Sequence, residues 1–266
     1  MSDRISIHID QHVADVRLNR PEKMNALDEE MFQAIIAAGK SLAENKEVRC
    51  VVLSGEGKAF CAGLDLSNFD FNNVEGLAGS KLLERTHGIA NKWQKVAWQW
   101  RELPVPVIGA IHGVAFGGGL QIMLGADIRY ITEDTKLSIM EVKWGIVPDM
   151  AGTQIMRHLI REDIIKELTY THRVFSGKEA VQYGFATHLA DDPHAAAMVL
   201  AQEIASKSPD AIVTAKKIIN AAPYLNPEEG LLSESQAQQN ILLKENQLEA
   251  VFSGMQKRPG NFKNYR

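Results

Sequence analysis

Three successive glycines, Gly117, Gly118 and Gly119, stand between an apolar run at 107–111 and a helix-like segment at 120–126. The apolar run is typical of a buried strand. Glycine inside a helix costs about 1 kcal/mol relative to alanine, so three at a helix entrance indicate that side chains are excluded there. Either the N–H groups at the helix start face a ligand oxygen, or the helix packs closely on the strand. The sequence leaves both interpretations open.

Composition places the chain among globular proteins that bury a core of their own. It has 266 residues, of which 45% are hydrophobic and 23% charged, and a chain of this length needs no disulfide or metal to hold its core together. The net charge of −4 disfavours general binding to nucleic acid or to an anionic membrane surface. No apolar run approaches the ~20 residues of a membrane span. Cys50 and Cys61 are the only cysteines, which fits a reducing, cytoplasmic location.

Hydrophobic periodicity predicts strand pairs followed by helices up to about residue 160, and mostly helices beyond it. Alternating residues at 5–9 and 13–18 predict a hairpin, and Asp28 is expected to cap a helix that ends near Glu44. A polar loop is expected at 67–80 and a long helix at 81–102. The other expected elements are strands at 50–53, 107–111, 128–132 and 136–138, and helices near 151–158, 163–170, 177–183, 192–207, 209–221, 228–243 and 245–256.

The chain is expected to divide into a core over residues 1–200 and a helical region over 201–266. Within the helical region, the segments at 231–243 and 248–255 carry more apolar surface than one small core needs. They form either a helical cap on the core or an interface between subunits.

A second turn, Ala62 to Asp65, resembles the glycine turn because it too can present backbone N–H groups. Each turn can point backbone N–H groups into a cleft, and two such groups converging on one oxygen form an oxyanion hole. A phosphate cradle is the rival interpretation. However, Gly57 and Lys58 are followed by Ala59 rather than by serine or threonine, so the nucleotide P-loop pattern is not met. The glycine run does not match G-x-G-x-x-G either.

Two carboxylates and one amide are the candidate proton-handling groups. Glu141 lies among apolar residues, and burial would raise its pKa and make it a better base near neutral pH. It is otherwise a strand-end carboxylate paired with Lys143 or an arginine. Asp149 follows another apolar run and is either a second acid or base, or a helix cap. Gln121 either contacts the same cleft or lies on the surface.

Other candidates have weaker signals. His112 stands alone at a strand end and is expected to be structural, and Cys61 has no neighbour that would lower its pKa. No histidine spacing suits a metal, so we expect no metal site. Trp93, Trp98 and Trp100 fall in the expected long helix, where they either line an acyl pocket or pack in the core.

Taken together, five segments resemble the crotonases, the enoyl-CoA hydratase/isomerase family. The resemblance covers essentially the whole chain, and the order and spacing of the segments make it specific. The segments are Leu18 to Leu27, Gly57 to Leu66, Ile111 to Gly119, Gly145 to Gln154 and Lys257 to Phe262.

This resemblance implies an α/β fold, a spiral of ββα units, whose C-terminal helices assemble trimers or dimers of trimers. It implies an acyl-CoA thioester substrate, with the carbonyl oxygen held by the N–H groups of Leu64 and Gly118. Coenzyme A is then part of the substrate, and no further cofactor is expected. The coenzyme contacts would fall on Lys23, Met24, Ala26, Ala59, Ala62, Gly63, Asp65 and Leu66, with Phe262 and Lys263 reaching a neighbouring subunit's coenzyme.

One position departs from the hydratases of the family. Those enzymes hold water between two glutamates; the second corresponds to Glu141 but the first to Gln121, which cannot take up a proton. The Δ3,Δ2-enoyl-CoA isomerases, with one glutamate at the Glu141 position, resemble the chain better here. Asp149 stands where dienoyl-CoA isomerases place an aspartate and where aryl-CoA dehalogenases place a nucleophile. Dienoyl-CoA isomerases carry a further aspartate at the Gln121 position.

The sequence therefore predicts an enzyme that moves a proton on an enoyl-CoA thioester through an enolate, with double-bond isomerisation favoured. Glu141 would be the principal base, Asp149 the second acid or base, and Gln121 would orient water or substrate. Hydration of 2-enoyl-CoA is the alternative reaction. A non-catalytic coenzyme A binder or an RNA-associated homologue is the alternative outside this class, and the acidic net charge speaks against general RNA binding.

Overall fold

A six-stranded sheet in the order β1-β2-β3-β4-β6-β9 lies at the centre of the computed structural model, which describes residues 3–65 and 82–265. The first two strands form the expected antiparallel hairpin, and the later neighbours are parallel. The strands are β1 (Ile5–Asp10), β2 (Val13–Leu18), β3 (Cys50–Gly55), β4 (Val107–Ile111), β6 (Ile128–Ile131) and β9 (His188–Leu189). The expected contact at Leu66 and the expected loop at 67–80 lie outside the described residues.

A smaller sheet has the order β5-β7-β8, with β5 at Val114–Phe116, β7 at Lys136–Ser138 and β8 at Phe175–Ser176. It takes the second strand of two strand pairs, β4-β5 and β6-β7, and adds β8. The chain passes from β4 in the large sheet to β5 in the small one and then into helix α4 (Gly118–Leu124). The mixed α/β fold with strand pairs followed by helices is confirmed. Strands β5, β8 and β9 were not predicted, because segments this short carry little periodicity, although the equally short β7 was predicted at 136–138.

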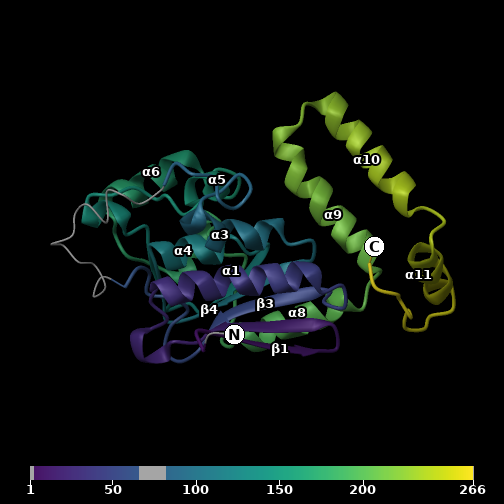
Figure 1. Cartoon of the computed structure of the whole chain (residues 1–266), viewed down its shortest axis with the longest axis horizontal. Helices are drawn as coiled ribbons and strands as arrows, with labels where there is room; N and C mark the ends of the chain where they lie inside the picture. The colour runs from purple at the N-terminus through teal and green to yellow at the C-terminus, as the bar shows by residue number, and fades with distance from the viewer. Residues whose placement is uncertain (1–2, 66–81, 266) are drawn as a thin grey trace.

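Helices cover the large sheet on both faces (Figure 1). Helix α8 (Pro193–Ala205) packs its alanines against Val13, Val52 and Ile108, while the alternate strand residues face the main core with α1 (Glu29–Glu44). This division follows from the two-residue repeat of a strand, which sends successive side chains to opposite faces. Helix α8 packs directly on the large sheet. The expected boundary at residue 200 therefore falls inside a helix of the core.

The predicted start of one helix, α1, is confirmed, and that of another, α3, is wrong. Asp28 caps α1, and its side chain accepts a hydrogen bond from the N–H of Met31 at 2.8 Å, as predicted. Helix α3, however, runs from Lys92 to Glu102, so the prediction of a helix from residue 81 was wrong over its first half. Asn91 and Gln94 form a capping box that starts the helix, and Gly88 has a φ of +71°, which no helix accommodates.

The remaining helices follow the expected pattern. They are α5 (Gly152–Met156), α6 (Glu162–Thr171), α7 (Gly177–Tyr183), α9 (Pro209–Ala221), α10 (Pro227–Ile241) and α11 (Glu245–Met255), with short 3-10 turns η1 (Pro21–Lys23), η3 (Glu141–Trp144) and η4 (Ala222–Tyr224). Within the described part of the chain, none of the helices combines the length and apolar character needed to span a lipid bilayer.

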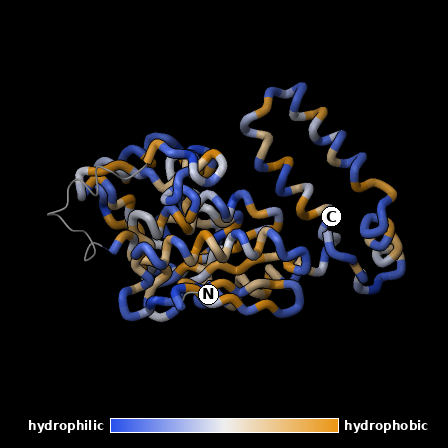
Figure 2. The backbone as a smooth tube through the Cα atoms, viewed as in Figure 1, coloured by the Kyte–Doolittle hydropathy of each residue, from blue (hydrophilic) through white to orange (hydrophobic). Residues whose placement is uncertain are grey.

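Helices α9, α10 and α11 stand away from the core (Figure 1). Helix α9 is tied back by the buried Lys216, whose Nζ donates to Asp127 Oδ2 at 2.7 Å and to two backbone carbonyls. The C-terminal tail returns to the core, where Arg49 donates to the carbonyl of Phe262 at 2.7 Å and Tyr265 is buried. Hydrophobic residues occur along these helices (Figure 2), and the side chains of Leu231, Leu232, Phe252 and Met255 are exposed.

Candidate active site

A cavity of about 690 Å³ opens where the two predicted turns meet. Its walls come from α1, the turn at 62–65, the start of α4, η3 and the segment before α5. Its lining includes Leu27, Gly63, Leu64, Asp65, Gly118, Glu141, Asp149 and Met150.

The N–H groups of Leu64 and Gly118 form the candidate oxyanion site. Leu27 pairs with the turn through Gly63 O and Asp65 N, at 2.8 and 3.0 Å, so the Leu64 N–H between them points to the other side. Gly118 begins α4, where helix N–H groups have no partner within the helix. Neither amide donates to any acceptor that the structure describes. A Cβ on Gly63 would lie 3.7 Å from Gly118 N, so the two turns are adjacent.

The glycines of both turns are required by close packing. Gly63 has a φ of +88°, and a Cβ there would lie 2.6 Å from the carbonyl oxygen of Phe116. A Cβ on Gly118 would lie 2.8 Å from Met150 Sδ, and one on Gly119 would meet the carbonyl oxygen of Cys61. The two interpretations of the glycine run are thus compatible: the backbone packs closely, and the amide of Gly118 still has no hydrogen-bond partner among the described residues.

Glu141 is the buried carboxylate of the site. It opens the 3-10 turn η3 and is only 7% exposed. Its Oε1 accepts a hydrogen bond from Gln121 Nε2 at 2.6 Å, whereas its Oε2 is buried without a partner among the described residues. Burial raises the pKa of Glu141, and the nearby negative charge of Asp149 raises it further. The expected pairing of Glu141 with Lys143 or an arginine is replaced by this contact with a neutral amide.

Asp149 lies on the same cavity, and partial loss of hydration raises its pKa. It does not cap a helix. The residue that precedes α5 is Ala151, which has a left-handed conformation and makes no side-chain cap. The capping interpretation of Asp149 is therefore wrong, and the structure instead places a second carboxyl group beside Glu141.

Gln121 is a buried bridge rather than a surface residue. It is 1% exposed, and its Oε1 accepts hydrogen bonds from the N–H groups of Met150 and Gly152, both at 2.9 Å. Its Nε2 binds Glu141. One amide thus ties the carboxylate of Glu141 to the backbone that immediately follows Asp149. Gln121 itself is not among the residues that line the cavity, and its side chain contacts Glu141 and the backbone of Met150 and Gly152.

The residues expected to hold coenzyme A divide into three groups. Ala62, Gly63 and Asp65 line the cavity. Lys23, Met24, Ala26 and Ala59 lie behind it in the η1 loop and the strand end, where the N–H of Ala62 donates to Met24 O at 2.9 Å. Phe262 and Lys263 lie on the C-terminal tail, where Lys263 pairs with Glu245 at 2.5 Å. Within one subunit the tail residues are not part of the cavity.

The sequence reasoning separated the other candidates only in part. Trp93 lines the cavity, whereas Trp100 is fully buried in the core and Trp98 donates to Glu102 at 2.9 Å. His112 is structural as predicted, with Nε2 3.0 Å from the carbonyl oxygen of Gly57. Burial raises the pKa of Cys61 to about 12, so its thiol stays protonated.

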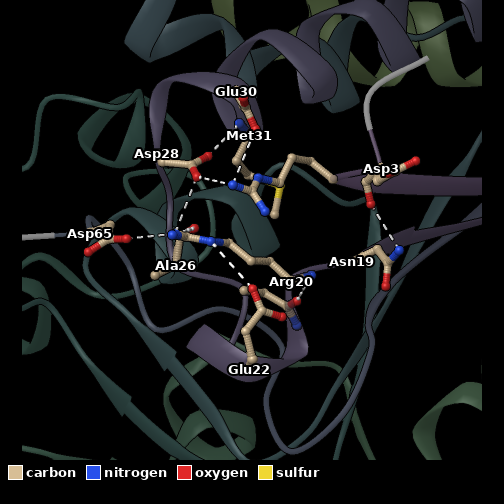
Figure 3. Close-up of polar contacts among 11 residues, drawn as sticks. Asp3, Asn19, Arg20, Glu22, Ala26, Asp28, Glu30, Met31 and Asp65 are labelled. Carbon is tan, nitrogen blue, oxygen red and sulfur yellow. Dashed lines mark hydrogen bonds and ion pairs between the residues drawn. The ribbon is translucent and has the colours of Figure 1, made fainter. Parts of the chain in front are cut away.

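A buried arginine beside the cavity was missed. Arg20 donates from Nη1 to Asp65 Oδ2 at 2.7 Å and lies 3.4 Å from Asp28 Oδ2 (Figure 3). An arginine in an irregular loop gives no sign of burial in the sequence, because its partners are far along the chain. Among the described residues, no group of three or more histidine, cysteine or acidic side chains is placed to hold a metal ion.

Comparison with known proteins gives consistent matches over the whole chain. A family model for enoyl-CoA hydratase/isomerase matches residues 8–265. The mitochondrial Delta(3,5)-Delta(2,4)-dienoyl-CoA isomerase of Mus musculus is 30% identical, over 93% of this chain and 78% of its own. The mitochondrial methylglutaconyl-CoA hydratase of the same organism is 31% identical, over 92% and 78%. A crystal structure of enoyl-CoA hydratase from Bacillus anthracis superposes with a TM-score of 0.87 at 29% identity, covering 98% of this chain and 99% of that one.

Proposed function

Since the chain belongs to the enoyl-CoA hydratase/isomerase family, we propose that it shifts a carbon–carbon double bond in an enoyl-CoA thioester through an enolate. The observation that carries this proposal is the state of Glu141. One of its oxygens is fixed by a neutral amide, while the other is buried without a partner beside the cavity. A carboxylate oxygen in this setting suits the removal of a proton from carbon.

In the proposed reaction, the thioester oxygen accepts hydrogen bonds from the amides of Leu64 and Gly118. Glu141 takes a proton from C2 of a 3-enoyl-CoA, and the electron pair delocalises over the thioester as a dienolate. Asp149 in its protonated form returns a proton at C4, which places the double bond between C2 and C3. No other reactant is consumed, and no cofactor is needed beyond the coenzyme A of the substrate. After turnover, the proton held by Glu141 passes back to Asp149, directly or through solvent.

The expected rate contributions of the two oxyanion donors and of the two carboxyl groups are consistent with these roles. Loss of one oxyanion donor typically costs about 2.7–4 kcal/mol of barrier, because the negative charge develops only as the proton leaves. A positioned acid or base contributes about 10²–10⁴-fold. The raised pKa values of Glu141 and Asp149 support proton exchange near neutral pH, since both carboxyl groups lie closer to that range than free ones do.

Hydration is the second candidate, and the similarity to methylglutaconyl-CoA hydratase favours it. The glutamine at 121 argues against the hydratase route that uses two glutamates, at positions 121 and 141, because an amide cannot take up the proton of water. A hydratase of this design would have to activate water with Glu141 and Asp149 instead.

One assay separates the two reactions. The enzyme is incubated with crotonyl-CoA and with 3-hexenoyl-CoA, and the absorbance of the conjugated enoyl thioester is followed. Isomerisation produces that absorbance from 3-hexenoyl-CoA, whereas hydration removes it from crotonyl-CoA. Absence of the first signal with presence of the second would overturn the isomerase proposal in favour of the hydratase. No turnover of either substrate, or of a dienoyl-CoA, would overturn both in favour of a specialised acyl-CoA or a non-catalytic binder.

We also propose that the chain forms a homotrimer, or a dimer of trimers, through α9, α10 and α11. The exposed apolar residues on these helices support this assembly. Light scattering on the eluting protein is expected to give about three or six times the subunit mass of 29.5 kDa. A mass of one subunit would overturn this part of the proposal.

A further inference from the structure

Arg20 joins three segments that surround the turn at 62–65 (Figure 3). Its guanidinium is 10% exposed. From Nη1 it donates to Asp65 Oδ2 at 2.7 Å and to the carbonyl of Ala26 at 3.2 Å, and it lies 3.4 Å from Asp28 Oδ2. The same Oδ2 of Asp28 accepts from Arg4 Nη2 at 2.7 Å. The cluster is therefore a chain of alternating charges, Arg4, Asp28, Arg20 and Asp65, that ends on the wall of the cavity.

The groups that Arg20 contacts flank the short pairing that orients the Leu64 amide. Leu27 binds the turn through Gly63 O and Asp65 N, which directs the Leu64 N–H away from Leu27. Ala26 and Asp28 are the neighbours of Leu27, and Asp65 is the neighbour of Leu64. Arg20 thus contacts Ala26 and Asp28 on either side of Leu27, and on the turn it contacts Asp65, whose N–H is bonded to Leu27. A shift of Asp65 would rotate the peptide that carries the Leu64 N–H.

We infer that Arg20 is a positioning residue that fixes the Leu64 amide in the oxyanion site by holding Asp65 against the Leu27 segment. The inference rests on the proposed function, because it assigns to Leu64 the thioester oxygen as its acceptor. Arg20 touches neither the substrate nor the reacting atoms in this scheme; Asp65 lines the cavity, whereas Arg20 lies behind it.

Arginine suits this position better than lysine. A guanidinium presents several N–H donors in a fixed plane, so one side chain can bind a carboxylate and a carbonyl and remain close to a second carboxylate. A lysine ammonium at the end of a flexible chain carries the same charge but cannot hold three groups in one geometry. Arg20→Lys therefore keeps the positive charge but no longer holds Asp65, Asp28 and the Ala26 carbonyl in one geometry.

The test measures the polarisation of a bound thioester carbonyl, which a merely structural residue would leave unchanged. The probe is 4-dimethylaminocinnamoyl-CoA, whose absorbance moves to longer wavelength as its carbonyl accepts stronger hydrogen bonds. Wild type, Arg20→Lys and Asp65→Asn are compared. The control is Arg17→Lys, since Arg17 pairs with Asp15 and Glu56 at 2.6 and 2.9 Å outside the cavity.

The inference predicts that Arg20→Lys loses at least about half of the wavelength shift and at least about tenfold in kcat, with KM within about threefold of wild type. Arg17→Lys is expected to keep both the shift and kcat. Should Arg20→Lys fail to fold, Asp65→Asn removes the charge of the same contact with a near-isosteric side chain, and it is expected to lose both wavelength shift and kcat in the same direction.

The outcomes separate this inference from the proposed function. A wild-type shift that persists in both Arg20→Lys and Asp65→Asn, with only the Tm lowered, overturns the positioning role and leaves the proposed function in place. A wild-type protein that binds the probe without any shift overturns the oxyanion site, and the positioning role with it. A normal shift in wild type that is lost in Arg20→Lys supports the positioning role even where neither enoyl substrate turns over.

Discussion

The side-chain amide of Gln121 donates to Glu141 Oε1 at 2.6 Å, while its own oxygen accepts from the N–H groups of Met150 and Gly152. Because Oε1 is occupied, Oε2 is the oxygen of Glu141 left to accept a proton. The same amide fixes the backbone next to Asp149. A single neutral residue therefore sets both which oxygen of Glu141 is available and where the second carboxyl group stands.

Glu141→Gln is expected to reduce turnover by at least about a hundredfold, because the amide cannot accept the substrate proton. Binding of coenzyme A is expected to persist, since the change is close to isosteric. Removing a carboxylate oxygen that is buried without a partner also removes a desolvation cost, so the Tm is expected to equal or exceed that of wild type. Stopped-flow turnover, calorimetric binding and thermal unfolding measure the three quantities. Turnover equal to wild type would exclude Glu141 as the base.

The acid limb of kcat/KM is expected above the pH at which a free glutamate titrates. Burial and the charge of Asp149 raise the pKa of Glu141, and a base must be ionised to act. Activity is therefore fully present above the raised pKa and is lost as the pH falls through it. A pH profile of kcat/KM for 3-hexenoyl-CoA measures the limb. A limb at the ordinary glutamate value would show that the desolvation seen in the structure does not act on catalysis.

Gln121→Glu is expected to move the acid limb to still higher pH. The new carboxylate would stand about where the amide Nε2 now lies, 2.6 Å from Glu141 Oε1, and two carboxylates at that separation share one proton. Turnover of 3-hexenoyl-CoA near neutral pH is expected to fall by about tenfold or more. The same variant is assayed with crotonyl-CoA, because it carries the second glutamate of a hydratase. An unchanged pH profile would contradict the direct contact between residues 121 and 141.

Gly63→Ala is expected to lower turnover by about a hundredfold, the usual effect of losing one oxyanion donor. Gly63 has a φ of +88°, and its Cβ would collide with the carbonyl oxygen of Phe116, displacing the adjacent Leu64 amide. Gly88→Ala is the matched control, since Gly88 has a φ of +71° with open space around a Cβ. Both substitutions carry a backbone strain of order 1–3 kcal/mol, so both lower the Tm. Equal activity in the two variants would remove the turn at 62–65 from the mechanism.

Asp149→Asn is expected to slow turnover at least about tenfold without a loss of stability. The aspartate caps no helix and its pKa is raised, so a neutral side chain costs the fold nothing. Asp192→Ala is the control: Asp192 caps α8 and accepts from the N–H of Ala195 at 3.0 Å. Its loss is expected to cost about 1 kcal/mol and to leave kcat unchanged. A reversed pattern, with stability lost in Asp149→Asn and its kcat intact, would make Asp149 structural.

Local signals in the sequence were sufficient for much of the fold and for selecting Glu141 and Asp149 as candidate acid groups. Alternation at 5–9 and 13–18 indicates the hairpin, and Asp28 before an amphipathic run indicates the start of α1. The glycines at 117–119 indicate a backbone approached closely by something else. Each of these depends on neighbours within a few residues, which is the range over which a sequence pattern reports structure directly.

Contacts between distant residues could not be predicted in this way. Gln121 and Glu141 are 20 residues apart and Arg20 and Asp65 are 45 apart, so their pairing depends on the tertiary fold. The helix-cap alternative for Asp149 arose because its local sequence allows a cap, and the turn through Ala151 removes it from that role. The start of α3 was misplaced because periodicity at 81–91 does not reveal the left-handed conformation of Gly88.

The C-terminal helices are anchored to the core at two separate points, by Lys216 from α9 and by the carbonyl of Phe262 from the tail. Because α10 and α11 lie between these two anchors, they cannot rotate as a unit about a single hinge. The apolar side chains along α10 and α11 are therefore presented at a set angle to the strands. Wherever a neighbouring copy docks on them, its orientation, and with it the distance between the two cavities, is dictated by bonds buried inside each subunit.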